Sequence, residues 1–149
     1  MEANEQNLPK ERTATEIAKK GYSDEEVASI FQLARLFAEN GNVRQSEVLA
    51  LGLNEIAPEF APGWLLRSYL HIQDKDLDKA VFAARQALRI DPNMVEALVF
   101  LVSCFLTLGD FHSAGTHLGE IGERIDGGSV NDSRISRLYE SQLVRFQNR

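Results

Sequence analysis

The feature that most constrains this chain is a repeat with a period of 34 residues. The segments GNV, KDL and GDF begin at Gly41, Lys75 and Gly109, each 34 residues after the one before. The same spacing relates further positions: Ile30, Trp64 and Leu98; Ser46, Ala80 and Ala114; Leu53, Ala87 and Ile121; Pro58 and Pro92. A period of this length is typical of arrays in which each unit packs on its neighbours. We therefore expect a stack of three similar units.

Each unit has the pattern of two helices joined by a short turn. In the first unit, apolar residues follow the i, i+3, i+4, i+7 spacing of one helical face: Ile30, Leu33, Ala34 and Phe37. Gly41 is a residue type that ends helices, and Asn42 is a type that begins them. Pro58 stands where the second helix must stop. The small residues at the Ser46 position predict that the paired helices approach closely there.

The units resemble the tetratricopeptide repeat, most clearly over residues 61–94. The positions that match the family pattern are Trp64, Ala80, Ala87 and Asp91-Pro92-Asn93. The departures are Arg67 and His71, at places that are usually apolar, and Lys75, which replaces the turn glycine. The resemblance implies an all-α fold: a right-handed superhelix of three helix-turn-helix repeats with a C-terminal capping helix.

We expect three parts along the chain. Residues 1–22 form an N-terminal extension, partly disordered, with a short helix over Thr13–Lys20. Residues 23–128 hold the repeats, at 27–60, 61–94 and 95–128, and Ser23 with Glu26 forms a capping box at their start. Residues 129–149 form the capping helix, whose apolar face covers the exposed flank of the last repeat. That face contains Ile135, Leu138, Tyr139 and Phe146.

Composition restricts the partners and the compartment. The chain has 16 Lys and Arg against 22 Asp and Glu, a net charge of −6 that disfavours nucleic acid as the main partner. Cys104 is the only cysteine, which excludes an internal disulfide and fits a reducing compartment. The apolar run Ala97–Leu108 is shorter than the ~20 residues of a membrane span. With no signal-type stretch at its start, the sequence predicts a cytoplasmic protein without membrane insertion.

No arrangement of residues in the sequence indicates catalysis. His112 and His117 are five residues apart, which on a helix turns them about 140° away from each other. Cys104 lies in an apolar helix and is most simply a small buried hydrophobe. No glycine-rich phosphate loop follows a strand. The sequence therefore predicts a protein that is not an enzyme and that uses no metal and no cofactor.

An array of three repeats forms a groove, which we expect the first helix of each repeat to line. The predicted partner-binding residues are Ala28, Phe31, Arg35, Leu65, Tyr69, Ile72, Val99, Ser103 and Leu106. Ordinary helix–helix core is the competing interpretation for any one of them. A partner, the terminal helix or a second copy of the chain would each cover this stripe. Such a groove suits an amphipathic helix or an extended apolar segment.

A carboxylate clamp is a rival function of such repeats. In the family, this clamp grips the acidic tails of general chaperones with lysine, asparagine and arginine side chains. The corresponding positions here are Phe31, Arg35, Leu66, Glu96 and Phe100, of which only Arg35 is basic. The sequence therefore disfavours a clamp.

The order of elements from Ser23 to Phe146 resembles the small chaperones of bacterial type III secretion. The ending NDSRISRLYESQLVRF is similar to the closing helix of needle-subunit chaperones, and the extension over residues 13–22 is closer to that of translocator chaperones. The resemblance implies a chaperone that holds an aggregation-prone secreted subunit, bound as a helix, with the needle subunit favoured. A small co-chaperone and a homodimer are left open. The alternative is a non-catalytic adaptor that joins two folded proteins.

Overall fold

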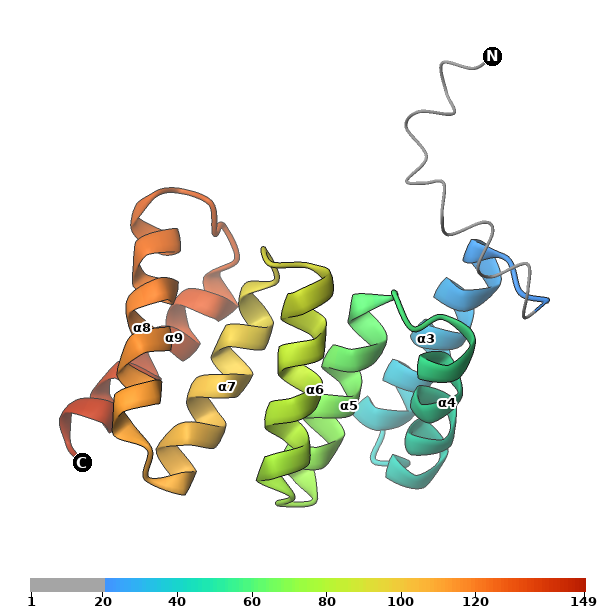
Figure 1. Ribbon diagram of the computed structural model, residues 1–149, viewed down its shortest axis with the longest axis horizontal. Helices are drawn as coiled ribbons and strands as arrows, with labels where there is room; N and C mark the ends of the chain where they lie inside the picture. The colour runs from blue at the N-terminus through green and yellow to red at the C-terminus, as the bar shows by residue number, and fades with distance from the viewer. Residues whose placement is uncertain (1–20) are drawn as a thin grey trace, which may run out of the picture.

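The computed structural model describes residues 21–149, which form seven helices in one array (Figure 1). The helices are α3 (Asp24–Glu39), α4 (Val43–Ile56), α5 (Ala61–Gln73), α6 (Leu77–Ile90), α7 (Val95–Leu108), α8 (Phe111–Asp126) and α9 (Ser133–Gln147). The prediction of an all-α fold with three helix pairs and a capping helix is confirmed. The helix predicted over Thr13–Lys20 lies outside the described residues, as does most of the predicted extension.

The helix ends follow from local chemistry. At the start of α3, the Ser23 hydroxyl accepts from the Glu26 N–H at 3.1 Å, and Glu26 Oε1 accepts from the Ser23 N–H at 2.8 Å. The turns within the first and third pairs contain Gly41 at φ +84° and Gly109 at φ +82°. Lys75 has φ +62° at the equivalent place in the second pair. All three hairpins therefore use the same left-handed turn, although only two have the glycine that favours it.

The seven helices lie in two layers. The first helices of successive pairs touch one another, so that α3, α5, α7 and then α9 form one continuous layer. Within residues 21–149, no comparable contact links α4 with α6 or α6 with α8. In Figure 1 these second helices lie nearer the viewer. Closer contact among the first helices places the concave side of the array on their layer.

The small residues predicted at the helix crossings lie in the core. Ser46, Ala80 and Ala114 are completely buried. Two of these crossings contain a serine, and each serine hydroxyl has a hydrogen-bond partner. Ser46 donates to the Ala34 carbonyl and Ser68 donates to the Ala80 carbonyl, both at 2.8 Å. The paired backbones approach closely without leaving a buried hydroxyl unpaired.

The capping helix α9 packs on both α7 and α8. Two glycines of α8 leave room for its aromatic rings. A Cβ at Gly122 would lie 2.8 Å from the Tyr139 hydroxyl oxygen, and one at Gly115 would lie 3.1 Å from the Phe146 ring. Ile135 is buried in the same interface. Through these contacts α9 closes the end of the array.

The register of α9 continues that of the first helices. Arg134 Nη2 lies 3.5 Å from Glu96 Oε2 near the start of α7, and Arg145 Nη2 lies 3.4 Å from Thr107 Oγ1 near its end. Both pairs are separated by 38 residues, so α9 runs alongside α7 in the same direction. Helix α9 occupies the place that the first helix of a fourth pair would take. It lies four residues later in the sequence than the 34-residue period predicts.

Candidate protein-binding groove

A groove of about 360 Å³ runs across the layer of first helices. Residues from α3, α5, α7 and α9 line it: Phe31, Arg35, Ala38, Glu39, Pro62, Leu65, Leu66, Tyr69, Glu96, Phe100 and Arg134. Every helix of the layer contributes, because the same register positions of successive first helices turn toward the concave side. The repeat itself therefore builds the groove.

Aromatic rings form much of the apolar part of the groove. The centroids of Tyr69 and Phe100 lie 6.4 Å apart, which places a ring of α5 beside a ring of α7. Phe31 of α3 meets Phe60 edge-on at 5.5 Å. Tyr69 keeps 36% of its surface exposed. Rings fixed by their neighbours but still open to solvent are well suited to receive apolar side chains of a partner.

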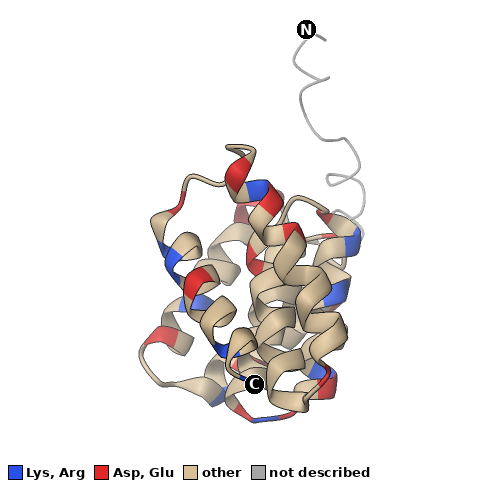
Figure 2. Ribbon diagram, turned by 90° about the vertical axis from the view of Figure 1, so that its left-hand side faces the viewer, with Lys and Arg blue, Asp and Glu red and all other residues tan. Residues whose placement is uncertain are grey.

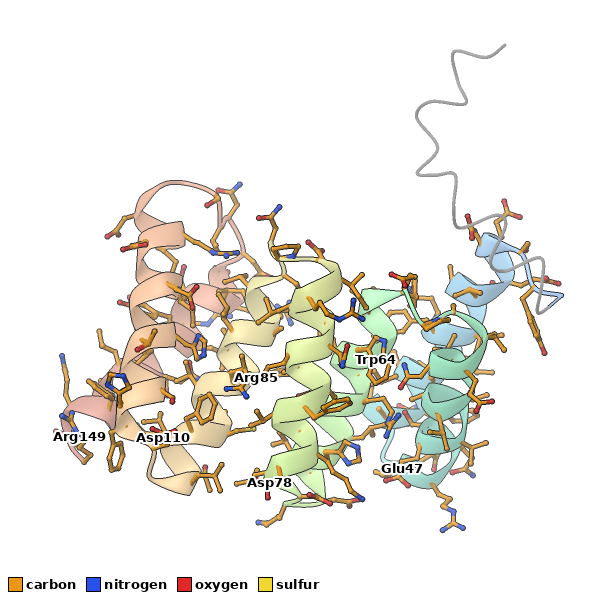
Figure 3. All side chains as sticks on the ribbon, viewed as in Figure 1. Glu47, Trp64, Asp78, Arg85, Asp110 and Arg149 are labelled. Carbon is orange, nitrogen blue, oxygen red and sulfur yellow. The ribbon has the colours of Figure 1, made fainter. Side chains whose placement is uncertain are left out.

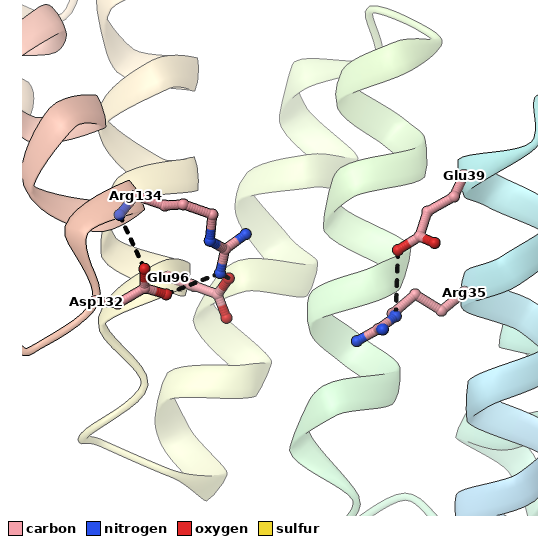
Figure 4. Close-up of polar contacts among 5 residues, drawn as sticks. All are labelled: Arg35, Glu39, Glu96, Asp132 and Arg134. Carbon is pink, nitrogen blue, oxygen red and sulfur yellow. Dashed lines mark hydrogen bonds and ion pairs between the residues drawn. The ribbon is translucent and has the colours of Figure 1, made fainter.

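Charged side chains at the groove are already paired (Figure 4). Arg35 Nε lies 3.3 Å from Glu39 Oε2 on α3. Arg134 Nη2 lies 2.9 Å from Asp132 Oδ2 and also contacts Glu96. Hydrogen bonds from the Arg134 side chain and backbone lower the pKa of Asp132. Both arginines that line this hollow, Arg35 and Arg134, have carboxylate partners, so neither is a free cation of the kind that a carboxylate clamp uses.

Four of the predicted partner-binding residues line this groove: Phe31, Arg35, Leu65 and Tyr69. Ala28 is exposed, and Ile72 and Ser103 are half-buried, but these three are not part of its lining. Their predicted contact with a partner stays a prediction, as does that of the four lining residues.

Val99 and Leu106 require a correction, because they do not face an open groove. Val99 is 3% exposed and Leu106 is 7% exposed, and both belong to the main buried cluster. Gln142 of α9 donates from Nε2 to the Val99 carbonyl at 2.9 Å. The capping helix therefore covers part of the third repeat, and it is one of the three covers that the sequence left open for this stripe.

Several lining residues were not predicted from the sequence, although the period carried a signal for three of them. Pro62 and Glu96 occupy the register of Ala28, and Ala38 occupies that of Ile72. A prediction made for one repeat could have been extended to the same position in the others. Arg134 gave no such signal, because it follows the four additional residues before α9.

Outside the groove, Cys104 and His117 are held in structural contacts. Cys104 is buried, and this burial raises the pKa of its thiol to about 11. His117 Nδ1 lies 2.8 Å from Glu120 Oε1, and its ring stacks on Phe105. No three His, Cys, Asp or Glu side chains of residues 21–149 are grouped to hold a metal ion. None of the helices in this part of the chain has both the length and the apolarity to cross a bilayer.

A second hollow of about 760 Å³ lies between the turn after α6 and the loop before α9. Its lining is mostly polar and comes mainly from these connections, with Asn93, Arg124, Ser129 and Asn131 among its residues. It lacks the exposed rings of the groove on the first helices. We therefore take the groove as the candidate site.

The comparisons with known proteins agree with the fold. A sequence profile described as the tetratricopeptide repeat matches residues 71–138, which is less than half of the chain. No curated protein matches the chain by sequence.

Solved structures of several different proteins share this fold. A complex of the TPR2AB domain of yeast Sti1 with pHSP90 has a TM-score of 0.75 at 17% identity, covering 97% of this chain and 55% of that one. The type III secretion translocator chaperone SycD of Yersinia enterocolitica has a TM-score of 0.71 at 13% identity, covering 86% and 90%. SycD in complex with a peptide of the translocator YopD has a TM-score of 0.65 at 14% identity, covering 83% and 96%. The chain thus spans about half of the Sti1 structure and most of SycD, and these identities show a shared fold.

Proposed function

The chain carries tetratricopeptide repeats, and from that premise we propose that it is a chaperone for an aggregation-prone type III secretion subunit. It holds the subunit before export by burying an amphipathic helix of it in the groove. The observation that carries this proposal is the groove itself, with Phe31, Leu65, Tyr69 and Phe100 gathered from three successive first helices. The similarity to SycD supports the choice of client system.

The physical basis is temporary burial of apolar surface. A subunit that later polymerises or enters a membrane exposes apolar side chains that aggregate in water. Each Leu-sized side chain that the groove buries contributes roughly 1.5–3 kcal/mol before the cost of ordering is subtracted. Three or four such side chains hold the client noncovalently, so that release requires only a competing partner and no nucleotide.

The test is co-purification of the chain with a secretion subunit encoded near it. Phe31→Asp and Tyr69→Asp place a carboxylate on the apolar floor and should weaken client binding at least tenfold. Phe82→Asp is the matched control, because Phe82 is 56% exposed on α6 and does not line the groove. Helical content should remain unchanged in all three. Folded groove variants that still retain the client would overturn the proposal.

The client of this chaperone is either a needle subunit or a translocator. The closing helix favours a needle subunit, whereas the similarity to SycD favours a translocator. Co-expression with each type of subunit separates the two, since only the true client should become soluble with the chain. A requirement for a third small protein in that complex would identify a co-chaperone.

A second candidate function is an adaptor that joins two folded proteins. The observation that favours it lies on the second helices, where Val48 of α4 and Phe82 of α6 are exposed at equivalent register positions. Figure 3 shows Trp64 of α5 between α4 and α6, and its ring meets that of Phe82 edge-on with centroids 6.2 Å apart. An adaptor requires partners that are stable when expressed alone. A chaperone client instead aggregates without the chain.

A further inference from the structure

The capping helix differs in charge from the rest of the protein. Residues 133–149 contain four arginines and one glutamate, whereas the chain as a whole has a net charge of −6. In Figure 2, Lys and Arg positions recur along the helix that leads to the C-terminus. Helix α9 itself is therefore cationic, although Glu120, Glu123 and Asp126 of α8 lie at the same end of the array.

The register of α9 places several of these side chains on the concave side. With the offset of 38 residues, Arg134, Arg137, Leu138 and Arg145 correspond to Glu96, Val99, Phe100 and Thr107 of α7. Arg134 lines the groove, and it also lines a smaller hollow of about 280 Å³ together with Arg137 and Leu138. The groove thus continues onto α9.

Two of these arginines lack a carboxylate partner among residues 21–149. Arg137 Nη1 donates to Ser133 Oγ and Arg145 Nη2 donates to Thr107 Oγ1, each at the long distance of 3.4 Å. Both side chains are exposed, and Leu138 beside them is 46% exposed. By contrast, Arg35 and Arg134 are neutralised by neighbouring carboxylates. The end of the groove on α9 therefore presents positive charge next to apolar surface.

We propose that the occupant of the groove is an amphipathic protein segment with carboxylates at one end of its apolar stripe. The apolar side chains lie on Phe31, Tyr69 and Phe100, and the carboxylates lie against Arg137 and Arg145. Complementary charge at one end fixes the direction in which the segment binds. A polynucleotide is disfavoured, because Glu39 and Glu96 belong to the groove and the protein is acidic overall. This inference rests on the proposed function and adds the charge and the direction of the client.

The experiment uses three labelled 18-residue helical peptides with the same stripe of leucines. The residues beside one end of the stripe are glutamate in the first peptide, glutamine in the second and lysine in the third. Binding to the full chain is measured by fluorescence anisotropy at low and at physiological salt. We expect the glutamate peptide to bind about fivefold more tightly than the glutamine peptide, and the lysine peptide to bind most weakly. Salt should reduce these differences.

The double variant Arg137→Glu, Arg145→Glu should abolish the preference for the glutamate peptide or reverse it. The matched control is Arg44→Glu, Arg89→Glu, which makes the same change of charge at exposed sites on α4 and α6 and should keep the preference. Circular dichroism checks that both variants fold.

The outcomes separate this inference from the proposed function. Equal affinity for the three peptides, or an unchanged preference in the α9 variant, overturns the inference and leaves the groove function standing when Tyr69→Asp still removes binding. Absence of binding by all three peptides overturns both. Tighter binding of a single-stranded oligonucleotide than of the glutamate peptide overturns the choice of partner.

Discussion

The two junctions between neighbouring helix pairs have the same geometry but different chemistry. At the first junction, Arg67 Nη1 of α5 donates to Asn54 Oδ1 of α4 at 2.7 Å. At the second, the equivalent positions hold Leu101 and Leu88, which belong to the main hydrophobic cluster. Similarly, His71 of the first junction corresponds to Phe105 of the second. The Cζ atom of Arg85, which Figure 3 labels on α6, lies 5.6 Å from the centroid of the Phe105 ring.

The difference indicates that the first pair is the most weakly attached. The Asn54 amide nitrogen is buried without a hydrogen-bond partner, and the half-buried Arg67 loses hydration. The second junction instead gains from apolar burial. Phe31 lies on the first pair and Tyr69 on the second, so the weaker junction lies between two main parts of the groove. The strength of this first junction therefore affects how readily the groove can change in width.

Removing apolar volume from the second junction should have the largest effect. Leu101 is 1% exposed, and Leu101→Ala should lower the free energy of unfolding by about 2–5 kcal/mol. Leu33→Ala is the matched control, since Leu33 holds the same register in the first pair but is 46% exposed, and it should cost below about 1 kcal/mol. Denaturant titration measures both. Equal losses would contradict the comparison.

Giving the first junction the residues of the second should strengthen it. The double variant Asn54→Leu, Arg67→Leu removes an unpaired amide and a desolvated guanidinium, and we expect a gain of about 1–2 kcal/mol. Each single variant should instead destabilise the protein by about 1 kcal/mol, because its former partner stays buried without a hydrogen bond. The four proteins form a double-mutant cycle. A double variant less stable than the wild type would show that the polar junction is not the weaker one.

The turn of the second hairpin can be stabilised by a substitution that changes neither junction. Lys75→Gly should raise the free energy of unfolding by about 1 kcal/mol, because glycine adopts its φ of +62° without steric cost. Lys75→Ala retains that cost and should change little. Thermal melts of the two variants measure the difference, and an equal effect of Gly and Ala would rule out this explanation.

Acid should weaken the first junction selectively. Burial, and then the neighbouring Arg67, lower the pKa of His71 below its ordinary 6.5. Asp76 and Asp74 act in the opposite direction, and Lys79 reinforces the lowering. The unfolded chain thus takes up a proton at higher pH than the folded chain. The contribution of His71 is complete above about pH 6.5 and is lost as the pH falls through the folded pKa.

His71→Phe, which copies Phe105, should reduce the loss of stability between pH 8 and pH 5. Unfolding free energies at the two pH values measure this effect, which we expect to be the smallest of the four. His112→Gln is the control, because it removes a histidine at an exposed position away from the first junction. A pH dependence that is the same in all three proteins would exclude His71 as its source.

The period predicted the hairpins well because the same local rules act in each. The structure has three helix pairs, whose first helices begin at Asp24, Ala61 and Val95. The crossings at Ser46, Ala80 and Ala114 follow from helix geometry alone. These features depend on contacts within a hairpin, and the sequence records such contacts directly.

The groove was only partly predictable because it depends on where α9 lies. Phe31 and Tyr69 follow from the register of the repeat. The burial of Val99 instead depends on the docking of α9, which follows a loop whose length departs from the repeat. The signal for that docking was the row of glycines at 115, 119 and 122, two of which receive the rings of Tyr139 and Phe146. Without the partner helix in view, those glycines indicate only a weak helix.

The in-register position of α9 has a consequence for protein engineering. The contacts of Tyr139 and Phe146 with α8, and the pairing of α9 with α7, set the orientation of the helix. The connection that leads to α9 does not set it. Residues 127–129 of this connection can therefore vary in length, whereas Val130 packs against the main cluster and Asp132 caps α9. This connection offers an insertion point for an affinity tag or a fluorophore. A fluorophore placed there could report occupancy of the neighbouring groove in real time.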